Sequence, residues 1–238
     1  VPGEDVLDLN GTMGLHPVLS KMKSLWDDGL LAIIQGVGYP NQSYSHFQSM
    51  HVWQTADNKG NLKEGWLGRY FDALKDMEDN VFNGLAVGRR MPYECFASNT
   101  PIPVVQNIDR YHLVGSNQLR DQALLKLYAS SPLETPYGIL LDNTLDALHK
   151  SSNALKKADD NYISEIEYPD TSLSKSLKLL AEAIIGDLGV KVGHVKIGGF
   201  DTHSDQLVDQ PDLIEDVSEA IYAFYQDLKA ANRDQNVL

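Results

Sequence analysis

The densest run of polar residues in the chain is GGFDTHSD, at positions 198–205. Within it, Asp201 and His203 stand two residues apart. A carboxylate oxygen and a neutral imidazole nitrogen are common ligands of zinc and similar divalent cations. The same run also fits an ordinary loop, in which Asp201 or Ser204 hydrogen-bonds to nearby amides. The pair therefore indicates a metal site. It would be only a half-site, because two ligands do not complete the coordination of an ion.

A second polar run, YPNQSYSH at positions 39–46, precedes a helical pattern. The free N–H groups at the start of a helix favour anions. Ser43 or Ser45 could act as a nucleophile there, and His46 as a base or a phosphate contact. The alternative is that a serine caps the helix and that His46 merely occupies its first turn.

Four further features bear on function or packing. Arg89 and Arg90 could hold an anionic group or form a solvated loop pair. The run GWLGRY at 65–70 favours a structural role, with glycines that allow close packing. Cys95 is the chain's one cysteine, so it cannot form an internal disulfide and fits a small buried apolar residue. His194 has no ligand-like neighbours in the sequence, which favours a core or surface role.

The elements that must position these residues alternate between helical and strand-like patterns. Two apolar runs, 30–36 and 190–199, predict strands, and shorter strand candidates lie at 85–87 and 104–105. Apolar periodicity predicts helices over 16–26, 45–55, 65–77, 117–129, 139–158, 173–185 and 212–230, the last with Pro211 at its start. Helices between apolar strands indicate an α/β fold whose sheet is covered on both faces.

This order of elements also predicts where the polar runs meet. Each run follows a predicted strand and precedes a helix. If the two strands are parallel, their exits lie at the same edge of the sheet, where open α/β sheets bind ligands. Asp201, His203, Ser45 and His46 would then line one shared cleft.

Composition limits the class of protein. The chain has 238 residues, of which 42% are apolar and 22% charged, as in soluble globular proteins and unlike disordered or disulfide-scaffold chains. Its net charge of −13 repels phosphate backbones, so we expect no nucleic-acid partner. No run approaches the roughly 18 consecutive apolar residues of a membrane span. The chain begins Val-Pro-Gly without a signal peptide, and we expect that the authentic start is missing or was removed.

Four segments together resemble one known family. They are LHPVLSKMKSLWDDGLLAIIQGVGYP, SHFQSMHVWQTAD, GWLGRYFDAL and GGFDTHSDQ, and they occur in the family's order between about residue 7 and residue 238. They are similar to the bacterial domain-of-unknown-function family 1501, a group of exported proteins placed near the alkaline phosphatase and sulfatase superfamily. The resemblance implies a three-layer α/β sandwich with a mainly parallel or mixed sheet. It also implies one alkaline-phosphatase-like domain over residues 1–238, truncated at both ends.

The resemblance further implies a site and a location. Superfamily members hold one or two ions of zinc, magnesium, calcium or manganese at strand ends, and Asp201 and His203 look like the ligands of one half-site. The comparison places the nucleophile near Gln42, which cannot serve, so Ser43 or Ser45 would require a shifted register. Family members usually begin with a twin-arginine export signal, which implies a periplasmic, cell-surface or secreted protein.

We therefore expect an exported, metal-dependent hydrolase of phosphate or sulfate esters. Asp201 and His203 would bind the metal, and Ser45 with His46 would lie on the side of a small anionic ester substrate. We expect the metal in the full-length protein and not in this fragment, because only one half-site is present. The alternative is a non-catalytic binding or secretion-associated protein that keeps the fold without the nucleophile. The sequence does not indicate an oligomeric state.

Overall fold

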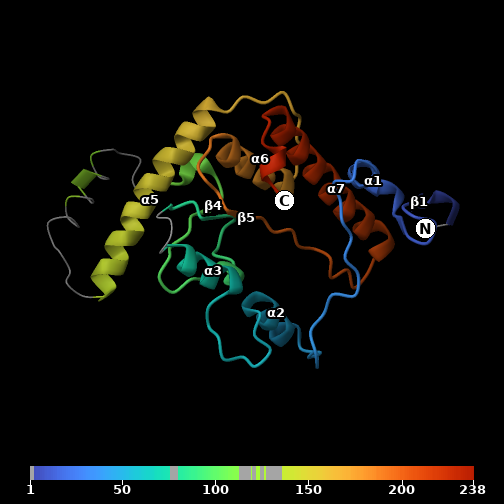
Figure 1. The fold of residues 1–238 in the computed structure, drawn as a ribbon, viewed down its shortest axis with the longest axis horizontal. Coiled ribbons are helices and arrows are strands. Elements are labelled where there is room, and N and C mark those ends of the chain that lie inside the picture. Colours follow the sequence, from blue (N-terminus) through green and yellow to red (C-terminus); the bar gives the residue numbers. More distant parts are fainter. Residues whose placement is uncertain (1–2, 76–79, 113–118, 120–121, 124–125, 127–135) are drawn as a thin grey trace. The chain divides into compact units, whose positions relative to one another are not determined.

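The computed structural model describes residues 3–75, 80–112, 119, 122–123, 126 and 136–238 (Figure 1). The chain forms two compact units, each assembled from segments that are distant in sequence. The first unit comprises Val1–Gly38, Ile163–Ala181 and Val195–Leu238. The second unit comprises Tyr39–Tyr162 and Glu182–His194.

The first unit is mainly helical. Leu173 and Leu177 of one helix and Ala220 of another form its buried apolar cluster, against which Val195 and Ile197 pack. The elements of the unit are η1 (Gly3–Asp5), β1 (Leu7–Asp8), β2 (Gly14–Leu15), η2 (Pro17–Leu19), α1 (Ser20–Asp27), α6 (Ser172–Ile185, its last residues belonging to the second unit), α7 (Gln206–Ala230) and η5 (Asp234–Asn236).

Polar contacts add specificity to the packing around α7. Asp227 is 2% exposed, and its carboxylate accepts hydrogen bonds from the hydroxyls of Ser164 at 2.6 Å and Tyr168 at 2.8 Å. These contacts fasten the loop that follows residue 162 to the helix. At the start of α1, the N–H of Met22 donates to the hydroxyl of Ser218 on α7 at 3.3 Å. The Ser218 side chain thus accepts a hydrogen bond from one of the N–H groups that the first turn of a helix leaves without a partner.

The second unit contains a parallel three-stranded sheet of order β4-β3-β5, whose strands are drawn in Figure 1. The four residues of the central strand are all buried, as expected for a parallel strand covered on both faces. The elements are α2 (His46–Thr55), α3 (Trp66–Lys75), β3 (Gly84–Val87), η3 (Tyr93–Cys95), β4 (Val104–Val105), η4 (Ile108–Arg110), α5 (Pro136–Asn161) and β5 (Val192–His194).

Close packing of α3 explains the glycines of the 65–70 run. Phe71 of α3 is fully buried beside Cys95 and Ile102. A Cβ atom built on Gly65 would lie 2.2 Å from the carbonyl oxygen of Glu94, and one on Gly68 would lie 1.9 Å from that of Phe96. Because both obstacles are backbone atoms, no side-chain rotation can relieve them, and the structural interpretation of these glycines is confirmed.

Most predicted elements are found close to their expected bounds. The helices expected over 45–55, 65–77 and 173–185 correspond to α2, α3 and α6, and the strand candidates at 85–87 and 104–105 lie in β3 and β4. The predicted strand at 190–199 is shorter than expected. Only Val192–His194 pairs with the sheet, and the following residues pack on α6 and α7 instead.

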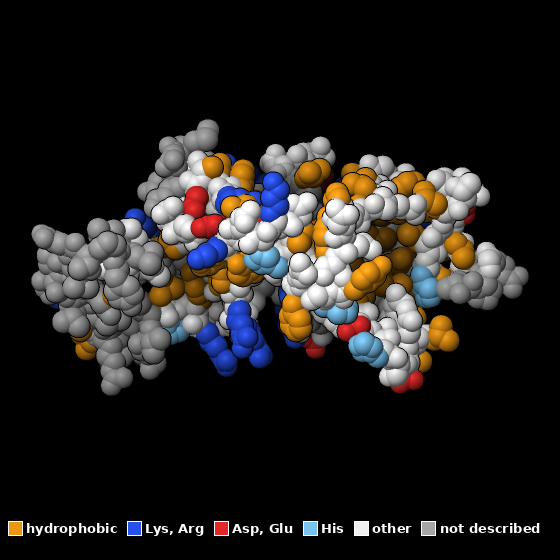
Figure 2. Space-filling model, turned by 90° about the horizontal axis from the view of Figure 1, so that it is seen from below, with side chains coloured by type: hydrophobic (Ala, Val, Ile, Leu, Met, Phe, Trp, Pro, Cys, Tyr) orange, Lys and Arg blue, Asp and Glu red, His pale blue; other side chains and the backbone are white. Residues whose placement is uncertain are grey.

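The prediction of a strand over 30–36 is wrong. These residues form no strand, and Ile34 is 81% exposed. A strand needs a neighbour to complete its backbone hydrogen bonds, and within the described ranges no segment pairs with this one. Figure 2 shows that hydrophobic side chains (orange) do lie at the surface of the molecule. An apolar run is therefore not sufficient to make a buried strand.

The last long helix begins earlier than predicted. It starts at Gln206 rather than at residue 212, so Pro211 lies inside it and not at its first turn. Residues 206–210 are exposed, so the first turn of α7 buries no apolar stripe. Apolar periodicity therefore could not locate the start of the helix. The helix expected over 117–129 falls largely outside the described residues. None of the helices in the described part is long and apolar enough to cross a membrane.

We expect Gly68→Ala to destabilise the protein strongly. The added methyl group meets a backbone carbonyl, and overpacking of this kind costs about 1–3 kcal/mol or more of unfolding free energy. Gly38→Ala is the matched control, because nothing lies within 4 Å of its Cβ position. Chemical denaturation followed by circular dichroism measures both. Equal unfolding midpoints for the two variants would contradict the packing described here.

We expect Cys95 to be unreactive in the native protein. Burial, with a further contribution from the charge of Glu94, raises the pKa of its thiol to about 12. At pH 8 only about 10⁻⁴ of the molecules would then carry the reactive thiolate. A chromogenic disulfide reagent at pH 8 should give no rapid signal from the native chain and one thiol per chain in guanidinium chloride. Rapid labelling of the native chain would show that Cys95 is not buried as described.

Candidate functional site

The loop between β5 and α7 brings Asp201 and His203 together. Nε2 of His203 lies 3.0 Å from Oδ2 of Asp201, and the backbone N–H of His203 donates to the carbonyl of Asp201 at 3.1 Å. The side chain of Asp201 is 78% exposed and that of His203 is 85% exposed, so both face solvent rather than the core. Gly199, just before them, has a φ of 98°, which favours glycine and allows the turn. The sequence prediction that these two residues act as a pair is thus compatible with their geometry.

This donor pair fits one edge of a metal site. Two tetrahedral ligands about 2.0–2.1 Å from zinc lie about 3.3 Å from each other, close to the separation seen here. A carboxylate only accepts hydrogen bonds, so Nε2 of His203 carries the proton in the present contact, and a cation would have to displace it. Over the described ranges, no three His, Cys, Asp or Glu side chains converge as a metal site. The pair would therefore need further ligands to hold an ion tightly.

The serines before α2 act as caps. The hydroxyl oxygen of Ser45 accepts the N–H of Gln48 at 3.4 Å, and the N–H of Ser45 donates to the hydroxyl of Ser43 at 3.1 Å. Ser43 in turn donates to the side-chain oxygen of Gln48 at 2.8 Å. The capping interpretation of this run is confirmed, because both hydroxyls have defined roles in starting the helix. In the part of the chain that is described, Ser45 and His46 form no hydrogen bond with each other.

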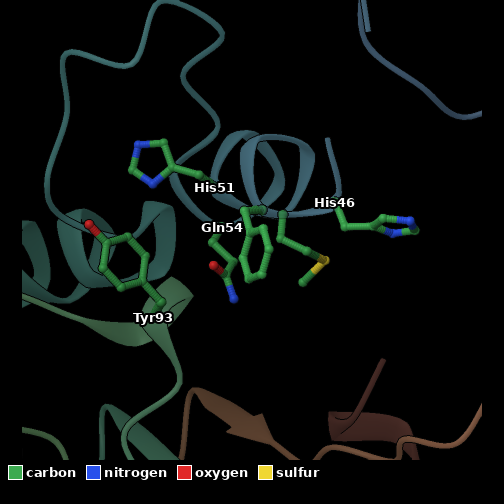
Figure 3. A pocket seen from close by; sticks show the side chains of 6 residues that line it. His46, His51, Gln54 and Tyr93 are labelled. Atoms are coloured by element: carbon green, nitrogen blue, oxygen red, sulfur yellow. The ribbon is translucent and has the colours of Figure 1, made fainter. Parts of the chain in front are cut away.

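His46 instead belongs to a pocket of about 390 Å³ along one side of α2 (Figure 3). His51 and Gln54 extend from the same helix, and Tyr93 faces them from η3, with the rings of His51 and Tyr93 centred 5.7 Å apart. In this view His46 points away from His51 and Tyr93. The pocket is completed by Phe47 and Met50.

One signal in the sequence points to this pocket. Residues 47, 50, 51 and 54 follow the pattern i, i+3, i+4, i+7, which places them on one face of a helix. The partner across the pocket, Tyr93, could not be inferred, since it reaches the helix only through the tertiary fold. His46 and His51, five residues apart, point in different directions in Figure 3.

A half-buried imidazole–carboxylate pair lies at the end of β5. Nε2 of His194 is 2.8 Å from Oε1 of Glu94, and the two side chains are 16% and 23% exposed. The residues are 100 positions apart, so their contact could not be inferred from the sequence. The pair joins η3 to the sheet next to Cys95, which suits a structural role for His194, as its sequence environment indicated.

The two predicted pairs fall in different units. Asp201 and His203 belong to the first unit, and Ser45 and His46 to the second. Each pair is described within its own unit. The shared cleft expected from the sequence therefore stays a prediction.

Comparison with known proteins identifies the family. No curated protein and no solved structure matches the chain. A family model described as "Protein of unknown function (DUF1501)" matches residues 32–238, which is most of the chain. With the α/β fold and the Asp201–His203 loop within the matched range, the chain belongs to the DUF1501 family.

Proposed function

We propose that this chain belongs to an exported, divalent-metal-dependent hydrolase of phosphate or sulfate esters, with an alkaline-phosphatase-like three-layer fold. The observation that carries the proposal is the solvent-facing contact between Asp201 and His203. An exposed pair of this kind contributes at most about 1 kcal/mol to folding, so stability alone gives little reason for the arrangement. The parallel sheet of the second unit and the helices of the chain also support the proposed alkaline-phosphatase-like fold.

The residues divide into a metal side and a substrate side. Asp201 and His203 would hold zinc, magnesium, calcium or manganese through one carboxylate oxygen and one imidazole nitrogen. When bound, the cation would supply Lewis-acid polarisation of the ester. His46, exposed at the first turn of α2, would contact the anionic group of the substrate or donate a proton to the leaving oxygen. Ser45 would keep the N-terminal N–H groups of α2 in position.

A specific observation also favours a non-catalytic alternative. The hydroxyls of Ser43 and Ser45 are both engaged in capping, and neither is hydrogen-bonded to an imidazole or carboxylate in the described structure. An unactivated serine is a weak nucleophile. The alternative is therefore a non-catalytic binding or secretion-associated protein that keeps the fold and the Asp201–His203 loop without turnover.

The metal site predicts a weak interaction that depends on both ligands. Isothermal titration with zinc should show low-affinity binding by this chain, because the described site supplies two ligands. Asp201→Asn and His203→Gln should each weaken it by about tenfold or more. His149→Gln, an exposed histidine on α5, is the matched control and should bind like the unchanged chain.

One result would contradict the predicted weak binding, and another would contradict the assignment of the ligands. Tight stoichiometric zinc binding would show that further ligands within the chain complete the site. Binding that is unchanged in both Asp201→Asn and His203→Gln would place the metal elsewhere.

Hydrolysis of p-nitrophenyl phosphate and sulfate, with and without chelator, separates the hydrolase from the non-catalytic alternative. Chelator-sensitive turnover that survives Ser45→Ala supports a water-dependent hydrolase, and metal binding without turnover supports the binding protein.

A further inference from the structure

A polar pocket lies where two strands of the parallel sheet end. Ala86 pairs with Val104 and Val87 with Val105, so the residues that follow β3 and β4 emerge side by side. They enclose a pocket of about 520 Å³ in the second unit. Its walls come from Gly88, Arg89, Val104, Gln106, Asn107, Arg110 and Tyr111. Ligands of open α/β sheets bind at this carboxyl edge, and the volume is within the range of small-molecule sites.

Two arginines give the pocket a positive charge in a chain whose net charge is −13. Arg89 follows β3, and Arg110 ends η4. No acidic side chain of the described residues pairs with either guanidinium group. The nearest acid in sequence, Asp109, lies 3.4 Å from the ammonium group of Lys156 on α5. Like charges in one pocket repel each other, and a bound anion would reduce that repulsion.

The surrounding residues hold Arg110 in place. The side-chain oxygen of Asn107 accepts the backbone N–H of Arg110 at 3.1 Å and so caps the start of η4. The phenol of Tyr111 lies 2.8 Å from the hydroxyl of Ser151, which itself donates to the carbonyl of Ala147 at 2.7 Å. Because Ser151 has only one proton, Tyr111 must be the donor in their contact. The loop is thus fixed to α5 before any ligand arrives.

Tyr111 also shapes what the pocket can accept. Its hydroxyl is used in the contact with Ser151, so the ring is the part that it offers to a ligand. Burial raises the pKa of Tyr111, which keeps the phenol neutral and free of repulsion toward anions. Gln106 lines the pocket as well and can donate a hydrogen bond. The pocket therefore combines charged donors for an anion with one flat apolar wall.

We propose that this pocket binds a small organic molecule that ends in a tetrahedral oxyanion, a phosphate or sulfate ester. Arg89 and Arg110 bind the anionic group, since guanidinium groups match its geometry and form strong charge-assisted hydrogen bonds. The organic part lies against Tyr111, because a pocket of about 520 Å³ has room for more than the anion. The proposal concerns binding and does not rest on hydrolysis or on the metal ligands Asp201 and His203.

Isothermal titration with phenyl phosphate at pH 8, in a phosphate-free buffer with EDTA, tests this proposal. We expect one site per chain. Arg89→Gln and Arg110→Gln should each weaken binding by about tenfold or more. Arg90→Gln is the matched control, because Arg90 is the exposed neighbour of Arg89 and does not line the pocket. All three side chains are exposed, so unchanged melting temperatures should show that the variants fold.

Further titrations distinguish the possible ligands, and they distinguish the arginine pocket from the Asp201–His203 pair. Phenyl sulfate and inorganic phosphate show which anion, and how much of the organic part, the pocket recognises. Asp201→Asn should bind phenyl phosphate normally in EDTA, so a failure of the metal proposal would leave this one standing. The proposal is overturned if none of the three anions binds, or if Arg90→Gln weakens binding as much as Arg89→Gln. In either case the arginines are a solvated loop pair.

Discussion

Much of the second unit depends on the burial of one short strand, β3. It is the central strand of the sheet, its four residues are buried, and it pairs in parallel on both sides. Such a strand must be covered closely, and Gly84 makes this possible, because a Cβ atom there would lie 2.7 Å from the ring of Phe71. The ring of Phe71, on α3, thus lies directly on the backbone of β3. Gly65, just before the helix, and Gly68 let it approach the backbone of residues 93–97 as closely.

The direction of this strand determines where chemistry can occur. Parallel strands end at a common edge, so Arg89 after β3 comes next to Gln106 after β4, although 17 positions separate them in the sequence. On the other side of β3, the strand β5 places His194 opposite Ala86 and beside Glu94. Side chains from distant segments meet here because the backbone ladder fixes the relative position of the strands.

Capping and loop contacts determine the local geometry of the other polar residues. At the start of α2, the serines satisfy N–H groups that the helix leaves free, which explains their spacing without reference to catalysis. Asp201 and His203 contact each other in an exposed loop and support little else in the fold. Residues with so small a structural role are free to bind a ligand. The buried carboxylate of Asp227 is the opposite case, since two hydroxyls depend on it.

The sequence by itself determined the helices and the local pairings. Apolar stripes with helical spacing located α2, α3 and α6, and the two-residue spacing of Asp201 and His203 put their side chains within reach of each other. Only the tertiary structure decided which apolar runs become strands. Residues 30–36 and 84–87 are both apolar, yet among the residues that the structure describes only the second run has neighbours that complete its backbone hydrogen bonds. It also decided that Arg89 meets Arg110 and that His194 meets Glu94. Such contacts depend on strand pairing between distant segments, which side-chain periodicity does not encode.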